Sequence, residues 1–393
     1  MKKKVFVVFG TRPEAIKLAP VIQELKNNPH LNVSVCVWRQ HREILDQVLD
    51  AFGVKPEFDL PISISDKDLL GRGLGIFRRL KGLFLSGLGL LRFFRLLRRE
   101  RPDLLVVQGD TSTVFLAAFF AFYFKISIAH VEAGLRTYDK YAPFPEEMNR
   151  QLLGRLADLH FAPTENAKRN LLSEHIPPEH IYVVGNTEID ALLRVLDRSK
   201  DQRVQKTLAE DLERNYGLRL YSDKKILLVT AHRRESFGSG LENICKALRE
   251  IAEKRDDVEI VYPVHPNPNV QRTVRAILGN VKNVSLVSPV AYVPFTFLMS
   301  KVHLILTDSG GIQEEAPSLN KPVLVMREKT ERNEGVELGV SKLVGTDKEK
   351  IVAATLELLD NSEAYAAMTN KKNPYGDGTA SAKIAKAIED YLR

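Results

Sequence analysis

Residues 304–316, LILTDSGGIQEEA, pass from an apolar run to a glycine pair and then to a helical pattern with two acids. An apolar run that breaks at glycines and opens a helix predicts a strand, turn and helix of a parallel α/β sheet. Small residues let the backbone approach phosphate closely, and the free N–H groups and positive end of the helix dipole favour an anion. The stretch therefore predicts a seat for a nucleotide diphosphate, with the Glu315 carboxylate accepting both ribose hydroxyls. The alternative is an ordinary helix start with solvated acids.

The alternation of strand and helix patterns extends along the whole chain. Short Val/Ile/Leu-rich runs between helical patterns are typical of parallel α/β layers. In the first half we expect strands at 4–9, 33–38, 104–108, 126–131, 159–162 and 181–184. In the second half we expect strands at 226–230, 258–262, 284–287, 303–307 and 322–326. Because ligands of doubly wound sheets bind beyond the carboxyl ends of the strands, two such domains predict a ligand-binding cleft between them.

Length and composition indicate a two-domain globular protein. A chain of 393 residues is too long for one ordinary core and suits two domains that meet near 185–190. The N-terminus lacks a signal-peptide pattern, so we expect a cytoplasmic location. Cys36 and Cys245 lie in apolar stretches and are interpreted as core residues. No metal-site spacing occurs, so we expect neither a metal nor a cofactor.

One segment carries the positive charge of the chain. Residues 69–101 hold nine basic residues against one acid, a net charge of +8, whereas the whole chain has +7. The remainder therefore has a net charge of −1. Because the fold outside this segment is not basic, we expect no nucleic-acid partner.

The same segment has an amphipathic helical pattern with two interpretations. Four apolar residues recur there with helical spacing, namely Leu90, Phe93, Phe94 and Leu97. In the favoured interpretation this stripe packs on the sheet. In the alternative, 82–89 and 90–101 form a basic hairpin, and the segment 71–101 makes a peripheral contact with an anionic membrane.

Acidic residues lie beyond the expected strands of the first half. Asp110, Glu132 and Glu146 come from three separate loops that should share one edge of the sheet. Carboxylates brought together raise one another's pKa, which suits general acid and base catalysis. Taken singly, each has an ordinary explanation: Asp110 caps the next helix, Glu132 pairs with Arg136, and Glu146 is a first-turn acid. Their joint placement favours the catalytic interpretation.

Basic residues follow other strand ends. Arg12 and Lys17 follow the first strand and put positive charge near a helix start. His232 and Arg233 follow the first strand of the second half, where a phosphate can sit. His265 lies in a Pro-rich turn, and such a histidine is more often a hydrogen-bonded turn residue than a catalyst.

With these blocks in view, the sequence resembles the non-hydrolysing UDP-N-acetylglucosamine 2-epimerases nearly end to end. The matching blocks are GTRPEAIK (10–17), QHRE (40–43), QGDT (108–111), HVEAGLRT (130–137), FPEEMNR (144–150), GNTEIDALL (185–193), AHRRESFG (231–238), DSGGIQEEAPSL (308–319), KPVLVMR (321–327), TER (330–332) and NPYGDG (373–378). The resemblance implies two Rossmann-like domains of the glycosyltransferase-B architecture around a cleft. We expect domains 1–186 and 187–376, with the C-terminal helix 377–393 returning to the first. It also implies a homodimer that binds UDP-N-acetylglucosamine and needs no metal.

Site residues follow from the matching positions. The resemblance implies catalytic roles for Asp110, Glu132, Glu146 and His232. The implied substrate contacts are Arg12, Lys17, Phe295, Ser309, Gly310, Gly311, Glu315 and Arg332, with His232 also contacting UDP. A second, regulatory substrate site is implied at Gln40, Glu43, Arg136, Arg233 and His265. The segment 71–101 is longer, more basic and more apolar than its counterpart in the family.

The implied reaction is the reversible conversion of UDP-N-acetylglucosamine to UDP-N-acetylmannosamine. The C2 proton is too weakly acidic for a carboxylate to remove it unaided, so the departure of UDP from C1 must assist. The product of this elimination is a glycal, to which UDP then adds back. Three other functions stay open: a glycosyltransferase of the same architecture, a hydrolysing epimerase that releases free N-acetylmannosamine, and a non-catalytic nucleotide-sugar sensor. The three carboxylates argue against the transferase and the sensor.

Overall fold

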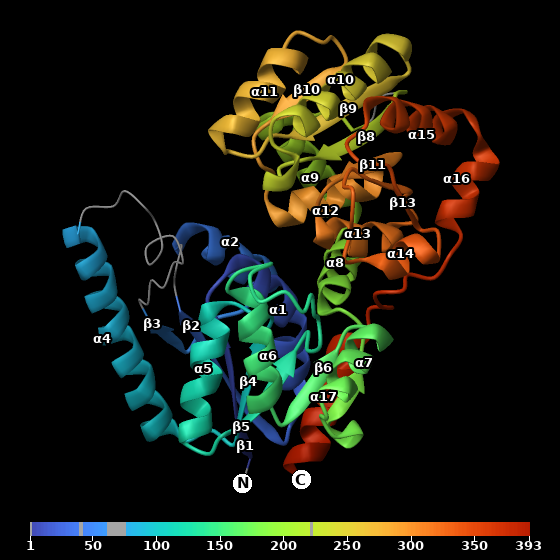
Figure 1. Cartoon of the computed structure of the whole chain (residues 1–393). Helices are drawn as coiled ribbons and strands as arrows, with labels where there is room; N and C mark the ends of the chain where they lie inside the picture. The colour runs from blue at the N-terminus through green and yellow to red at the C-terminus, as the bar shows by residue number, and fades with distance from the viewer. Residues whose placement is uncertain (1, 39–41, 61–75, 221–222) are drawn as a thin grey trace. The chain divides into compact units, whose positions relative to one another are not determined.

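The computed structural model describes residues 2–38, 42–60, 76–220 and 223–393, of which 42–44, 76–86 and 234 are described by their backbone alone. The chain forms two compact units (Figure 1). Unit 1 comprises Met1–Ala191 with Tyr375–Arg393, and unit 2 comprises Leu192–Pro374. Both units contain a parallel sheet between helices, so the predicted pair of Rossmann-like domains is confirmed.

Unit 1 is built on a seven-stranded parallel sheet in the order β3-β2-β1-β4-β5-β6-β7. Its strands are β1 (Lys3–Phe9), β2 (Leu31–Trp38), β3 (Phe58–Leu60), β4 (Leu104–Gln108), β5 (Ser127–Val131), β6 (Leu159–Ala162) and β7 (Ile181–Val183). The order reverses between β1 and β4, which pair in parallel with Val5 beside Leu104. Loops diverge beyond the carboxyl ends of two such strands, and this switch point is where doubly wound sheets bind ligands.

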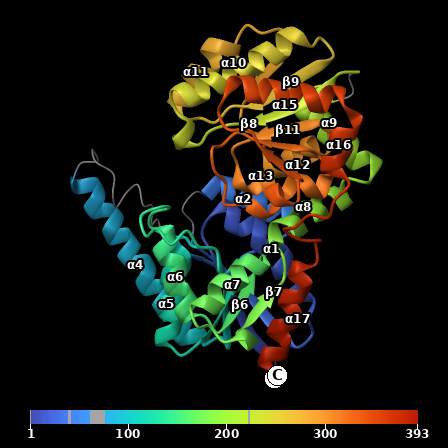
Figure 2. The same cartoon turned by 45° about the vertical axis from the view of Figure 1, so that its right-hand side comes forward.

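Helices cover both faces of this sheet (Figures 1 and 2). They are α1 (Arg12–Asn27), α2 (Arg42–Phe52), α4 (Ile76–Glu100), α5 (Ser112–Tyr123), α6 (Glu146–Leu156), α7 (Glu165–Ser173) and α17 (Ala380–Leu392), whereas α8 (Thr187–Arg198) runs from unit 1 into unit 2. Helices α4, α5 and α6 share one apolar cluster with alternate residues of β1, β2 and β4. Strands buried on both faces are apolar throughout, as in β4, where all five residues are buried.

Unit 2 repeats the same topology with six strands in the order β10-β9-β8-β11-β12-β13. The strands are β8 (Lys225–Thr230), β9 (Val258–Pro263), β10 (Val284–Val287), β11 (Leu304–Thr307), β12 (Val323–Val325) and β13 (Ser341–Leu343). The helices are α9 (Gln202–Tyr216), α10 (Ser239–Lys254), α11 (Pro268–Leu278), α12 (Tyr292–Lys301), α13 (Gly310–Glu315), α14 (Asn333–Glu337), α15 (Lys348–Asp360) and α16 (Ser362–Thr369). The switch point of this sheet lies between β8 and β11.

Two strands escaped the sequence analysis. Both β3 and β13 are three residues long and lie at sheet edges. Their sequences, FDL and SKL, are too short to show an apolar period, and each pairs with one neighbour only. These edges form because the adjacent strand, β2 or β12, offers its free backbone groups.

The described part of the basic segment is one continuous helix, so the alternative interpretation of a hairpin is wrong. Helix α4 runs from Ile76 to Glu100 without a turn at 82–89, while 71–75 lie outside the described residues. The predicted packing of its last turns on the sheet is confirmed, since Phe93 and Leu97 are fully buried. Phe94, expected in the buried stripe, is 38% exposed, and Leu96 is buried in its place. Within the described part of the chain, no helix combines the length and apolarity that crossing a bilayer requires.

The C-terminal helix belongs to unit 1, as predicted. Its start is held by the buried Asp190 carboxylate, which accepts hydrogen bonds from the backbone N–H groups of Ala380 and Ser381 at 3.3 and 2.7 Å and from the Ser381 hydroxyl at 2.5 Å. The Asn186 N–H donates to the Tyr375 carbonyl at 2.7 Å beside it. A buried carboxylate thus supplies the acceptor that the first turn of a helix lacks.

Replacing this carboxylate is expected to loosen α17. We expect Asp190→Ala to lower the free energy of unfolding of unit 1 by about 2 kcal/mol, because buried N–H groups lose their acceptor. Urea unfolding followed by fluorescence measures this in unit 1, since Trp38 in β2 is the one tryptophan of the sequence. The exposed Asp50→Ala should change stability by less than about 0.5 kcal/mol. Equal effects of the two substitutions would contradict the role of Asp190.

Candidate functional site

A buried glutamate joins the two loops at the switch point of unit 1. Glu14, which is 2% exposed, accepts hydrogen bonds from the N–H groups of Gly10 and Thr11 at 2.6 and 3.0 Å and from the Thr111 hydroxyl at 2.6 Å. Burial raises the pKa of its carboxyl, and the hydrogen bonds oppose that rise. Glu14 thereby joins the loop after β1 to the loop after β4. The first loop leads to the half-buried Arg12, and the second carries Asp110.

Glu132, which follows β5, is paired with a lysine of α1. Its Oε2 accepts from Lys17 Nζ at 2.5 Å and from Gln108 Nε2 at 2.7 Å. Lys17 also lies 3.6 Å from Glu188 Oε2. The ordinary explanation that Glu132 pairs with Arg136 is wrong. The predicted substrate contact Lys17 and the predicted catalytic Glu132 thus meet.

Asp110 is held by α6 rather than capping a helix. Arg150 donates to its Oδ2 from Nε at 3.0 Å and from Nη2 at 2.5 Å, and Asn149 Nδ2 donates to its carbonyl at 2.8 Å. The cap of α5 is the Thr111 hydroxyl, which accepts from Val114 N–H. Burial raises the pKa of the Asp110 carboxyl; the Arg150 charge opposes this rise and the Glu132 charge adds to it. A carboxyl with a raised pKa is suited to giving and taking protons near neutral pH.

Glu146 begins the helix that holds Asp110. It is half-buried in the first turn of α6, and the next residue, Glu147, is fully buried. Glu147 accepts from the N–H groups of Thr137 and Tyr138, both at 3.0 Å. Burial disfavours its charge, but these bonds and one from Gln151 outweigh burial and lower its pKa. The structure therefore brings Asp110, Glu132 and the helix of Glu146 to one sheet edge.

A buried aspartate joins the loops at the switch point of unit 2. Asp308 follows β11, is 0% exposed, and accepts from the N–H groups of His232 and Arg233 at 2.6 and 2.7 Å. His232 Nδ1 lies 3.5 Å from Asp308 Oδ1, so the aspartate also orients the imidazole. The predicted phosphate-binding residues of β8 and the glycine turn after β11 are therefore neighbours.

Arg332 lies over the glycine turn. A Cβ added to Gly310 would lie 2.9 Å from its Cζ, and its Nε donates to Glu314 Oε1 at 2.8 Å. Arg327, 6% exposed, holds the surrounding loops by donating to Glu235 at 2.6 Å and to Glu331 at 2.9 Å. Glycine at 310 is therefore required for the guanidinium to approach the start of α13, where Ser309 is the N-cap and Gly311 the second helical residue.

Glu315 and Phe295 lie beside this turn. The Tyr292 hydroxyl donates to Glu315 Oε1 at 3.2 Å, and both residues are buried. Phe295, in the same helix as Tyr292, is partly buried against the core of unit 2. Both therefore lie on elements that flank the predicted diphosphate seat.

The residues of the predicted regulatory site fall into three groups. Gln40 lies outside the described residues, as does the side chain of Glu43. The Arg136 side chain in unit 1 is fully buried and donates to both Glu174 carboxylate oxygens, at 2.7 and 2.8 Å. In unit 2 Arg233 is exposed, and His265 stacks on His232 with ring centroids 5.1 Å apart.

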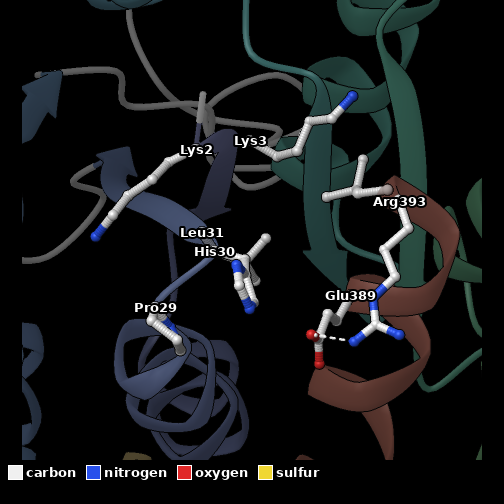
Figure 3. A pocket seen from close by; sticks show the side chains of 8 residues that line it. Lys2, Lys3, Pro29, His30, Leu31, Glu389 and Arg393 are labelled. Carbon is white, nitrogen blue, oxygen red and sulfur yellow. Dashed lines mark hydrogen bonds and ion pairs between the residues drawn. The ribbon is translucent and has the colours of Figure 1, made fainter.

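A surface hollow of about 630 Å³ lies at the opposite edge of the unit 1 sheet (Figure 3). It is lined where β1 and β2 begin and where α17 ends, by residues that include Lys2, His30 and Arg393. The carboxylates lie at the carboxyl ends of the strands, so this hollow is not the candidate site. Among the described residues no three His, Cys, Asp or Glu side chains gather as a metal site requires.

Comparison with known proteins matches these features to one family. A family model described as UDP-N-acetylglucosamine 2-epimerase matches residues 23–389. The chain belongs to the UDP-N-acetylglucosamine 2-epimerase family. It is 51% identical over 388 residues to the UDP-N-acetylglucosamine 2-epimerase of Salmonella typhimurium strain LT2, covering 99% of both chains. It is 50% identical to that of Escherichia coli K12, covering 98% of both.

Solved structures extend the likeness to the fold of this epimerase. The UDP-GlcNAc 2-epimerase of Neisseria meningitidis, bound to UDP-GlcNAc, has a TM-score of 0.85 at 44% identity over 98% of this chain and 100% of its own. The S. aureus MnaA structure with UDP has a TM-score of 0.82 at 45% identity over 99% and 97%. The predicted domain pair of the glycosyltransferase-B architecture is confirmed by these neighbours.

Several residues that build the site of the epimerase were missed by the sequence analysis. They are Glu14, Gln108, Glu147, Arg150 and Asp308, which hold other site groups. Each lies inside a matching block, so its position offered a signal, but four of the five, all except Glu147, also bind a partner that is distant in sequence. Arg150, for instance, is 40 residues from Asp110.

A buried histidine also holds the Asp110 loop of the epimerase. His130 Nε2 lies 2.7 Å from the Gly109 carbonyl, so this nitrogen carries the proton. Burial lowers the pKa of His130 to about 4, and His160, beside it on β6, has its pKa lowered by burial to about 3. Both rings therefore stay neutral in the folded protein at neutral pH.

The buried His130 should make the stability of the protein depend on pH. An unfolded histidine takes up a proton near pH 6.5, whereas folded His130 takes one up only at about pH 4. The free energy of unfolding should therefore fall as the pH falls from 6.5 towards 4. His130→Gln keeps an N–H donor for Gly109 and removes the titration. Between about pH 7 and about pH 5 we expect wild type to lose roughly 2 kcal/mol more stability than this variant. Urea unfolding at both pH values measures the difference, and parallel losses would contradict it.

Proposed function

We propose that the chain interconverts UDP-N-acetylglucosamine and UDP-N-acetylmannosamine by eliminating UDP and adding it back through a glycal. The observation that carries this proposal is the pair of carboxylates Asp110 and Glu132 at neighbouring strand ends, close enough for one charge to raise the other's pKa. The proposal is also supported by relatives that are UDP-N-acetylglucosamine 2-epimerases by name.

The reaction needs both an acid–base group and a departing diphosphate. One carboxylate removes the proton from C2 while the C1–O bond breaks and its electron pair leaves with UDP. The new C1–C2 double bond is that of the glycal. A proton then adds to C2 on the opposite face, and the diphosphate oxygen re-forms the bond to C1. Acid and base on opposite faces explain why more than one carboxylate is needed.

We assign these proton transfers to unit 1, with Asp110, Glu132 and Glu146 as the acid–base groups. Lys17 stabilises Glu132 as an anion, and Arg150 does the same for Asp110. Arg12 is assigned the role of a substrate contact. The raised pKa of Asp110 makes this carboxyl suited to hold and donate a proton.

We assign binding of the leaving group to the second domain, which we propose to be residues 187–376. His232, Arg332 and the start of α13 at Ser309–Gly311 stabilise the departing diphosphate by positive charge and N–H groups. Glu315 accepts ribose hydroxyls and Phe295 contacts the base. Because the diphosphate is both anchor and leaving group, these residues affect turnover as well as affinity. The homodimer, the cytoplasmic location and the regulatory site remain predictions.

Gly310→Ala tests the diphosphate seat. The added Cβ displaces the end of the Arg332 side chain, whereas the fold needs no adjustment of backbone. We expect UDP affinity to fall about tenfold, the effect of one lost charge-assisted hydrogen bond. Isothermal titration with UDP measures this. Gly240→Ala, whose Cβ meets Thr346 at an ordinary 3.5 Å, is the control and should bind as wild type does.

Deuterium incorporation tests the reaction. In heavy water, NMR should find deuterium at C2 of both UDP-sugars, because the returning proton comes from solvent through the carboxylates. Asp110→Asn and Glu132→Gln should each lower kcat by at least about a hundredfold, whereas the exposed Asp50→Asn should not. Free N-acetylmannosamine would indicate a hydrolysing epimerase. If no deuterium enters C2 and no UDP-N-acetylmannosamine forms, the proposal is wrong, and a transferase or a sensor is favoured.

A further inference from the structure

Helix α4 presents leucines and arginines together on the side that points away from the sheet. Leu88, Leu91, Arg95 and Arg98 are spaced by three and four residues and form one stripe, with Arg92 beside it. Leu88 is 41% and Leu91 53% exposed, and the three arginines are exposed as well. We call these five residues the outward stripe. The opposite side of the helix, with Phe93, Leu96 and Leu97, is buried on the sheet.

The arginines of the outward stripe lack a counter-charge in the part of the chain that the structure describes. Among the described residues, Arg92, Arg95 and Arg98 form neither an ion pair nor a side-chain hydrogen bond. Exposed basic residues on other helices do form ion pairs, as Lys254 does with Glu250 at 2.7 Å and Arg249 with Glu253 at 2.7 Å. The positive charge of the stripe is therefore available to an anionic partner.

Helix α5 packs beside α4. Figures 1 and 2 show α4 and α5 side by side. The Phe94 ring joins them through contacts with Phe120 and Phe124, at centroid distances of 6.3 and 4.7 Å. Phe122 is 56% and Tyr123 68% exposed at the end of α5. The helix next to α4 therefore also carries exposed aromatic side chains, which are common at membrane interfaces.

We propose that the outward stripe of α4 binds the surface of an anionic lipid bilayer. The helix lies in the plane of the interface, with Leu88 and Leu91 inserted among the headgroups and Arg92, Arg95 and Arg98 bonded to lipid phosphates. Residues 69–101 have a net charge of +8 in a chain whose remainder is −1, so electrostatic attraction orients the protein by this segment. The contact is peripheral and reversible.

Charge favours lipid over two other occupants. In a two-fold contact between copies of α4, each stripe would face an identical set of unpaired arginines, and like charges repel. A nucleic acid would satisfy the arginines but would leave Leu88 and Leu91 without an apolar environment. An anionic bilayer satisfies both halves of the stripe.

Vesicle flotation of the full chain tests the proposal. We expect the protein to float with phosphatidylcholine vesicles that contain phosphatidylglycerol, not with phosphatidylcholine alone, and to be released by salt. The triple variant Arg92→Gln, Arg95→Gln, Arg98→Gln should bind about a hundredfold more weakly, since each basic residue contributes roughly fivefold. Leu88→Ser with Leu91→Ser should also weaken binding while keeping the salt dependence.

A matched control removes the same charge elsewhere. Arg203→Gln, Lys206→Gln and Arg214→Gln lie on exposed positions of α9 and should leave vesicle binding unchanged. All variants should keep epimerase activity and their thermal unfolding transition. Equal flotation of the arginine variant and wild type, equal loss in the α9 control, or no flotation at all would overturn the proposal. Two results obtained without vesicle binding would also overturn it. One is a sedimentation coefficient that differs between the arginine variant and wild type, and the other is binding of the wild-type protein to duplex DNA.

Discussion

A buried carboxylate at each switch point accepts hydrogen bonds from the backbone of the loop after the first strand. In unit 1 this is Glu14, which accepts from Gly10 and Thr11; in unit 2 it is Asp308, which accepts from His232 and Arg233. Charge is buried at a high energetic cost unless it is hydrogen-bonded, and buried N–H groups need an acceptor. Each carboxylate therefore fixes two loops at once, and the remaining site residues are placed relative to those loops.

The reacting groups differ from these structural carboxylates in their partners. Glu14 and Asp308 accept mainly from neutral N–H and O–H groups, whereas Glu132 and Asp110 are each paired with a cation, Lys17 and Arg150. Partial exposure makes these carboxylates accessible to a substrate, and the cation beside each one stabilises its charged form. In unit 1 the carboxyl edge of the sheet thus holds both a structural carboxylate, Glu14, which positions the loops, and the proposed catalytic carboxylates Asp110 and Glu132.

The sequence pattern was sufficient to predict an element wherever the residues of that element alone show which of its faces are buried. The long strands were predicted because a strand covered on both faces must be apolar along its whole length. Local pattern failed at β3 and β13, which exist only because a neighbouring strand has an open edge. It failed also at Phe94, because helical spacing gives the buried side of α4 only to within about one residue, and packing encloses Leu96 instead.

The sequence by itself determined the alternation of strands and helices, the blocks at the strand ends and the family to which the chain belongs. Only the tertiary structure decided which charges meet. Lys17 pairs with Glu132 across 115 residues, and Arg136, the neighbour of Glu132 along the chain, pairs with Glu174 instead. The physical reason is that local sequence encodes conformational preference and burial. Contacts between loops depend on the order of strands in the sheet, and that order is fixed by packing of the whole domain.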